Sequence, residues 1–202
     1  MAGEDVEGDL RANVWRGDIV DRVMADVMMH VPVDAELAAR NDMVVICCAY
    51  AEERMAVAFD PDAVPVHAFP AFRSRRVAVE GGATADIFLS AAYNGMLAGS
   101  LDRTRGFDAA VERFGSGATV ALMATRAQAE WAVKKTGRKA VVEEWPMMGV
   151  VRAAWPIGLA TRVDAHDLAY ELEDALAQAA DDGRLKEIHA RFGVGWTPPP
   201  KE

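Results

Sequence analysis

His30 is the side chain in this sequence that most invites a chemical role. It lies in the run Ala25-Asp26-Val27-Met28-Met29-His30-Val31-Pro32-Val33-Asp34. Pro32 prevents His30 and Asp34 from sharing a regular helical face, and no second histidine lies near in the sequence, whereas metal ligands are usually closely spaced. We therefore expect a structural histidine at a strand end, with a ligand contact as the alternative.

Two pairs of neighbouring acids, Glu52-Glu53 and Glu143-Glu144, are the other candidates for acid–base chemistry. Neighbours in a strand point to opposite faces, so neither pair is expected to share one proton, and both are expected to be solvated. The sequence contains no G-x-S-x-G, H-E-x-x-H, phosphate loop or Asp-rich calcium loop. It therefore predicts no catalytic residue, no metal site and no cofactor.

The only cysteines are Cys47 and Cys48, which follow the apolar residues 44–46. A disulfide between sequence neighbours is strained and rare, so no structural disulfide is expected. Free cysteine is among the most buried residue types, which favours plain buried thiols over a redox pair.

Strands and helices alternate along most of the chain, each pattern read from hydrophobic spacing and from Gly, Pro and capping residues. The expected strands are 25–31, 43–49, 54–59, 76–79, 119–123, 141–142 and 157–161. The expected helices are 34–41, 84–93, 107–114, one that starts at Thr125 with Gln128 in a capping box, 167–180 and 184–192. This alternation indicates an α/β architecture with mostly parallel sheets.

The composition narrows the classes of partner. The chain has 202 residues, of which 51% are hydrophobic, and its net charge is -9. Such a surface repels phosphate backbones, so nucleic acid is not expected as a partner. No run is long and apolar enough to span a bilayer, so the chain is not expected to be membrane-embedded, and residues 1–10 do not form a secretory signal.

The order of these elements resembles that of solute-binding protein family 3. The run 25–34, continued by Ala35-Glu36-Leu37-Ala38-Ala39-Arg40-Asn41, is similar to a branch of substrate-binding proteins of ABC-transporter type that is associated with quinoprotein methanol dehydrogenases. Weaker similarities lie in 82–86, 120–127, 155–160 and 180–185, so the resemblance covers about residues 14–194.

The resemblance implies a two-lobed periplasmic-binding-protein type 2 architecture. Lobe I would consist of residues 14–59 and 149–194, and lobe II of residues 60–148, between a polar tail (1–13) and a Pro-rich tail (195–202). Complete members begin with two strand–helix units in lobe I that nothing before Val14 supplies. We therefore expect a truncated lobe I whose exposed apolar sheet is open to aggregation or to a partner.

The resemblance also implies ligand-binding positions. Arg40 falls near the place where amino-acid binders hold a ligand carboxylate, and its alternative is a helix ion pair with Glu36. Tyr50 is where relatives place an aromatic residue beside the cleft, with packing at the hinge as the alternative. His30 completes the set expected in lobe I.

In lobe II the resemblance implies Thr84 and Thr125. Thr84 follows two glycines at a helix start, which suits an anion, although it could serve only as a helix cap. Thr125 stands where amino-acid binders carry an Asp for the ligand ammonium, a charge that Thr does not supply, and capping of the next helix is its alternative. Together these residues argue against an α-amino acid ligand.

We therefore expect a non-enzymatic solute-binding or accessory protein linked to quinoprotein alcohol oxidation, periplasmic by resemblance although no signal peptide is visible. Its partner would be a small non-amino-acid ligand or a quinoprotein dehydrogenase component. The alternatives are a dehydratase-like enzyme on the same scaffold, which would need Glu52 or Glu53 in the cleft, and a truncated remnant that binds no ligand.

Overall fold

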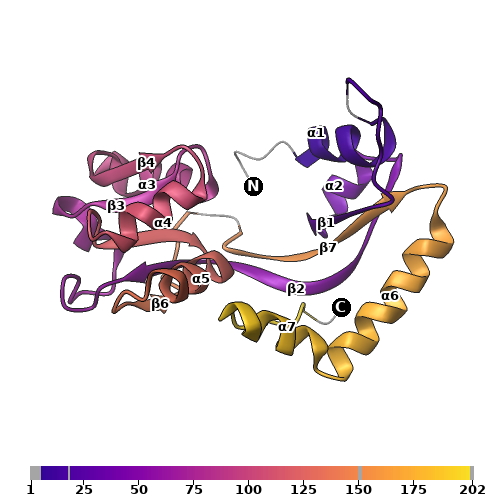
Figure 1. Ribbon diagram of the computed structural model, residues 1–202. Coiled ribbons are helices and arrows are strands. Elements are labelled where there is room, and N and C mark those ends of the chain that lie inside the picture. The colour runs from indigo at the N-terminus through magenta and orange to yellow at the C-terminus, as the bar shows by residue number, and fades with distance from the viewer. Residues whose placement is uncertain (1–5, 18, 150–151, 201–202) are drawn as a thin grey trace. The chain divides into compact units, whose positions relative to one another are not determined.

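The computed structural model describes residues 6–17, 19–149 and 152–200 (Figure 1). The chain divides into two compact units, and each is described by itself. Unit 1 contains the described residues of 54–153 and 192–195, and unit 2 contains those of 5–53, 154–191 and 196–202. The strand β2 (Val44–Phe59) runs from unit 2 into unit 1. The chain passes from one unit to the other between residues 53 and 54 and again between 153 and 154, whereas the sequence predicted lobe boundaries at 59/60 and 148/149.

Unit 1 is built on a mixed sheet. Its strands are the second part of β2, β3 (Val77–Glu80), β4 (Leu101–Thr104), β5 (Ala121–Thr125) and β6 (Val141–Glu143). β3 pairs in parallel with both β4 and β5, whereas β2 pairs antiparallel with β5 and β6. The three parallel strands β3, β4 and β5 therefore run in one direction and end at one edge.

Helices cover both faces of this sheet. Its helices are α3 (Thr84–Gly95), α4 (Phe107–Gly115), α5 (Arg126–Thr136) and 3₁₀ helices at Phe69–Ser74 and Ala98–Ser100. On one face, Phe114 of α4 and Ala129 of α5 pack with Leu122 of β5 in a buried cluster. The other face holds an aromatic cluster in which Phe59, Phe69 and Trp145 are in ring contact.

Unit 2 contains three neighbouring strands, β1 (Val27–Pro32), β7 (Ala154–Arg162) and the first part of β2, with β7 in the middle. β1 and β7 pair antiparallel, and the register shifts between Met29 and Val31. His30 lies at this bulge with a positive φ of 64°. The helices are α1 (Val6–Leu10), a π-helical turn (Arg11–Trp15), α2 (Ala35–Ala39), α6 (His166–Asp181) and α7 (Arg184–Phe192).

The N-terminal residues of unit 2 form part of its core, which corrects the expectation of a polar tail over residues 1–13. Leu10 and Val14 are fully buried and cluster with Val31, Leu37 and Val44. The apolar side of this short helical segment packs on strand β1 and helix α2, a long-range contact that the polar local composition concealed. Residues 1–5 lie outside the described residues.

Of the other expectations drawn from the sequence, two are confirmed and two are wrong. The α/β class and the helix that Asp34 begins are confirmed, since the Asp34 carboxylate accepts the Leu37 N–H at 2.9 Å. The expectation of mostly parallel pairing is wrong, because the described pairings of β1 with β7 and of β2 with β5 and β6 are antiparallel. The two strands expected at 43–49 and 54–59 form the single strand β2. The sequence did not predict β4.

Gly158 in β7 tests the packing of unit 2. A Cβ at Gly158 would lie 2.2 Å from the Cys47 carbonyl oxygen and 2.7 Å from Val33 Cγ2. Gly158→Ala should therefore lower the free energy of unfolding by about 1–3 kcal/mol, the usual cost of overpacking. Gly99→Ala is the matched control, since a Cβ there meets nothing within 4 Å. Equal urea midpoints for the two variants would contradict this packing.

Candidate functional site

The carboxyl edge of the unit 1 sheet is the strongest candidate for a binding surface. β3, β4 and β5 end there, and α3, α4 and α5 begin within a few residues of those ends. Ligands of open α/β sheets bind outside the carboxyl ends of parallel strands. Each helix N-terminus also presents unpaired N–H groups and a partial positive charge. The edge is therefore suited to a polar or anionic group.

Thr84 is the first residue of α3, as the sequence predicted, but it is not the helix cap that was its expected alternative, because Ala83 occupies the cap position. The preceding turn contains Gly82, whose φ is 83°, and Ala83 provides no side-chain cap. Within the described part of the chain, the backbone N–H groups of Thr84 and Ala85 donate to no protein acceptor. Two N–H groups at the start of a helix can together hold a carboxylate or another small anion.

Asp86 is a buried carboxylate directly behind this turn. It accepts the Gly82 N–H at 3.0 Å, the Ser90 hydroxyl at 2.9 Å and Arg103 Nε at 2.7 Å. Burial alone would raise the pKa of Asp86, but these bonds outweigh burial and the pKa lies below its usual value of 3.8. Asp86 is thus a fixed anion that holds the turn in shape and is matched by Arg103.

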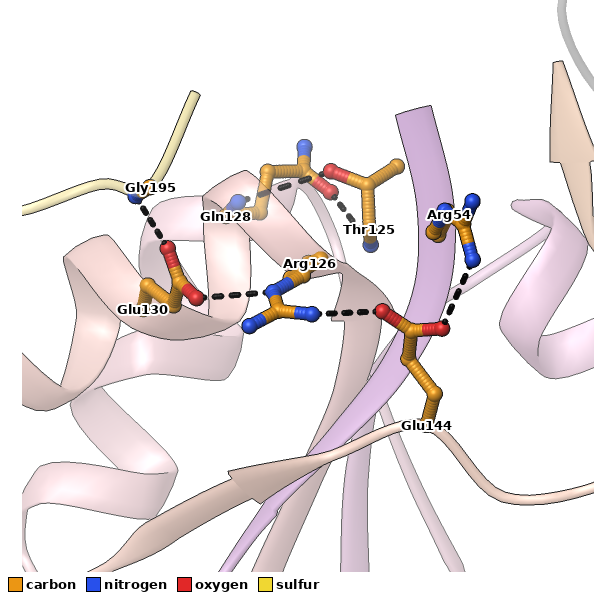
Figure 2. Close-up of polar contacts among 7 residues, drawn as sticks. All are labelled: Arg54, Thr125, Arg126, Gln128, Glu130, Glu144 and Gly195. Carbon is orange, nitrogen blue, oxygen red and sulfur yellow. Dashed lines mark hydrogen bonds and ion pairs between the residues drawn. The ribbon is translucent and has the colours of Figure 1, made fainter. Parts of the chain in front are cut away.

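Thr125 ends β5 and caps α5. Its hydroxyl accepts the Gln128 N–H at 3.4 Å, and Gln128 Oε1 accepts the Thr125 N–H at 3.2 Å (Figure 2). This pair confirms the expected capping box. The capping role of Thr125 therefore operates in this structure, and a ligand contact by its side chain stays a prediction.

Beside Thr125, a chain of charges links four side chains in unit 1 (Figure 2). Glu144 accepts Arg54 Nη1 at 3.3 Å and Arg126 Nη1 at 2.6 Å. Arg126 Nε also donates to Glu130 at 2.8 Å, and the other oxygen of Glu130 accepts the Gly195 N–H at 2.6 Å. The hydrogen bonds to Glu130 and Glu144 raise the pKa of Arg126. Glu144 is exposed, as expected, although both of its oxygens are paired. Of the two pairs of acids expected to be solvated, the expectation is wrong for Glu53, which is buried.

In unit 2 the structure brings together two of the predicted residues. The half-buried Tyr50 side chain accepts a hydrogen bond from the backbone of His30. Burial raises the pKa of Tyr50, the His30 bond opposes the rise, and the charge of Glu53 adds to it. The Trp196 indole donates to the Tyr50 carbonyl at 2.8 Å, so the expected Pro-rich tail is held along β2.

Arg40 is at the C-terminal end of α2. Its Nε is 2.7 Å from Glu7 Oε1, and the side chain is 56% exposed. The hydrogen bond to Glu7 raises the pKa of Arg40. The expected alternative was an ion pair with Glu36, and Glu7 of α1 takes that place.

Sequence reasoning missed Asp86, Arg103, Arg126 and Glu144 as members of the edge. Asp86 follows the glycine turn by four residues, a local signal that could have identified it. The partners of Glu144 are 18 and 90 residues away in the sequence. No described group of three His, Cys, Asp or Glu side chains could hold a metal ion. No helix among the described residues is long and apolar enough to cross a membrane.

Comparison with solved structures identifies the fold. An ancestral cationic amino acid solute-binding protein is 19% identical, with a TM-score of 0.66 over 83% of this chain and 69% of that one. The GluR0 ligand-binding core in complex with L-glutamate is 16% identical, with a TM-score of 0.59 over 83% and 72%. The arginine-, lysine-, histidine-binding protein ArtJ from Geobacillus stearothermophilus is 16% identical, with a TM-score of 0.55 over 83% and 69%.

These similarities show that the chain has the two-lobed type 2 fold of periplasmic solute-binding proteins, as expected from the sequence. No family model matches the chain. No curated protein matches it significantly in sequence.

Asp86→Asn tests the electrostatic support of the α3 turn. Because the pKa of Asp86 is lowered on folding, its charge stabilises the folded chain above about pH 4, and this contribution disappears as the pH falls through the folded pKa. The variant should lose about 1–3 kcal/mol at pH 7, with a smaller loss at pH 3. Urea unfolding at both pH values measures this difference.

The matched control is Asp108→Asn, whose side chain is 79% exposed beside Lys135. Exposed ion pairs of this kind contribute about 0–1 kcal/mol. Equal losses for the two variants at pH 7, or a loss at Asp86 that does not depend on pH, would show that Asp86 does not hold the turn through its charge.

Proposed function

We propose that this chain is a non-enzymatic solute-binding or accessory protein that binds a small ligand. The observation that carries the proposal is the α3 turn, where the N–H groups of Thr84 and Ala85 point to no protein acceptor in the described chain. Proteins of this fold with solved structures bind small molecules, as the names of an amino acid solute-binding protein and a glutamate complex state.

The ligand is proposed to be a small carboxylate without an ammonium group. The α3 turn offers N–H donors and helix polarity, which suit a carboxylate. At the other expected ligand position, Thr125 supplies no negative charge for an ammonium, and its hydroxyl already accepts the Gln128 N–H. The carboxylates of Glu130 and Glu144 are both already ion-paired with Arg126. Neither of them therefore replaces the negative charge that a ligand ammonium would need.

Further contacts are proposed for Tyr50, His30 and Arg40 of unit 2. Tyr50 and His30 lie together, and the positive φ of His30 re-aims its side chain at the bulge. Arg40 would have to exchange Glu7 for a ligand carboxylate, which is feasible because the pair is exposed.

The similarity of residues 25–41 to the quinoprotein-associated branch supports a further proposal, that the protein acts in the periplasm with a quinoprotein alcohol dehydrogenase. The net charge of -9 would favour a basic surface on that partner. A tagged full-length chain, expressed in methanol-grown cells, should recover a quinoprotein dehydrogenase subunit identified by mass spectrometry. Equal recovery by an untagged control would contradict this link.

Calorimetric titration with glycolate, formate, acetate, L-arginine and L-glutamate tests the ligand class. At least one of the three ammonium-free carboxylates should bind, and the two amino acids should not. Thr84→Pro should weaken that binding about ten-fold or more, because it removes a charge-assisted donor. Pro is tolerated at the first position of a helix, so α3 should still form.

Thr84→Ser is the matched control, since it keeps both the backbone N–H and a hydroxyl. It should bind as the wild type does. Tighter binding of an amino acid than of any ammonium-free carboxylate, or undiminished binding by Thr84→Pro, would contradict the proposed site.

A further inference from the structure

Asn94 and Gly95 lie at the C-terminal end of α3, where the backbone has an unusual conformation. Three consecutive residues have a positive φ, which is 52° at Tyr93, 58° at Asn94 and 79° at Gly95. Only glycine adopts this left-handed region without steric cost, although asparagine tolerates it better than most residues. Tyr93 and Asn94 are exposed, and a Cβ at Gly95 would lie 3.7 Å from the Ser90 carbonyl oxygen, an ordinary contact. Packing around this turn is therefore loose.

The chain has three asparagines, and the structure holds their side chains differently. Asn13 Nδ2 donates to the Asp9 carbonyl at 2.9 Å, and Asn41 Nδ2 donates to the Leu37 carbonyl at 2.8 Å. Within the part of the chain that the structure describes, the Asn94 side chain makes no hydrogen bond. Its carboxamide can therefore turn toward its own backbone, whereas the other two are held in place.

The residue that follows each asparagine decides how easily the next backbone nitrogen reaches the side chain. Asn13 is followed by the buried, β-branched Val14 and Asn41 by an aspartate, whereas Asn94 is followed by Gly95. A Cβ on the following residue crowds a nitrogen that approaches the side-chain carbon, and glycine has no Cβ. Only Asn94 therefore combines an exposed, unheld carboxamide with an unhindered neighbouring nitrogen.

We propose that Asn94-Gly95 is a self-modification site, at which the side-chain amide of Asn94 becomes a carboxylate through a cyclic imide. The Gly95 backbone nitrogen forms a bond to Asn94 Cγ, the bond from Cγ to the side-chain nitrogen breaks, and ammonia leaves with the proton of the Gly95 N–H. A water molecule from the solvent then opens the ring. Cleavage at Cγ gives aspartate, cleavage at the backbone carbonyl carbon gives isoaspartate, and no atom changes oxidation state.

The modification acts on the end of α3. The last carbonyl groups of a helix carry a partial negative charge, so a new carboxylate at this end is repelled. Isoaspartate also adds a carbon to the backbone and so displaces the left-handed turn. Both products should therefore lower the stability of the helix that begins at Thr84, and the urea midpoint of the chain should fall as the conversion proceeds.

Asp182-Gly183 is a matched comparison in the same chain. Gly183 also has a positive φ, 83°, and also follows a residue that can form a cyclic imide. The Asp182 carboxylate, however, accepts the Arg184 backbone N–H at 3.0 Å and Arg184 Nε at 2.7 Å. A carboxylate that is paired in this way is a poor electrophile and is held away from the Gly183 nitrogen, so we expect no isoaspartate there.

Peptide mapping by tandem mass spectrometry, after incubation of the folded full chain in mildly alkaline buffer, tests the proposal. Asn94 should lose its amide and give both aspartate and isoaspartate, while Asn13 and Asn41 stay intact. An isoaspartyl methyltransferase should label residue 94 and not Asp182. Gly95→Ala should slow the conversion several-fold, and circular dichroism checks its fold, because alanine is disfavoured at a φ of 79°.

Asn94→Gln is the second variant, since its amide would need a larger ring to form the imide, and it should stay unmodified. Three results would overturn the proposal. They are conversion of Asn13 or Asn41 as fast as that of Asn94, conversion of a folded Gly95→Ala as fast as that of the wild type, and conversion of Asn94 only after unfolding in urea.

Discussion

Three parallel strands of unit 1 end at one edge, and three helices begin there. This arrangement places the N-termini of α3, α4 and α5 close to the ends of β3, β4 and β5. The unpaired N–H groups and the helix dipoles then give the edge a positive character that no single residue determines. The positions of Thr84 and Thr125 follow from it, since each stands where a strand of this group passes into a helix.

The charged side chains around this edge are paired with one another, and these pairs hold the helix starts in position. Asp86 fixes the α3 turn and is itself matched by Arg103 at 2.7 Å. Glu144 joins Arg54 to Arg126, and Glu130 joins Arg126 to the Gly195 backbone (Figure 2). Because these charges are already paired, the N–H groups of the α3 turn remain the donors available to a small anion. In a chain with a net charge of -9, the proposed carboxylate ligand would depend on such a local group of donors.

The features predicted from the sequence are those with local causes. The helix caps belong to this group. They are the capping box of Thr125 and Gln128, three residues apart, and the Asp34 cap of α2. The α/β class followed from alternating periodicity. The type 2 fold, by contrast, rested on a resemblance that the solved structures then supported.

What could not be predicted depends on contacts distant in sequence. Burial of Leu10 against Val31 and Val44 turned an expected polar tail into part of a core. Strands were expected at 43–49 and 54–59 with a gap between them, but pairing with neighbouring strands keeps β2 continuous. The bond between Tyr50 and the His30 backbone, and the kink at Cys48, arise from tertiary packing in unit 2.

The most direct test of the central claim is amide NMR of the full chain during titration with glycolate. If the carboxyl edge of unit 1 binds small carboxylates, the amide signals of Thr84 and Ala85 should shift and saturate together. The amide signals of His166 and Asp167, at the start of α6 in unit 2, should stay unchanged and serve as the control helix start. Equal shifts at both helix starts, or saturable shifts confined to other residues, would contradict the account.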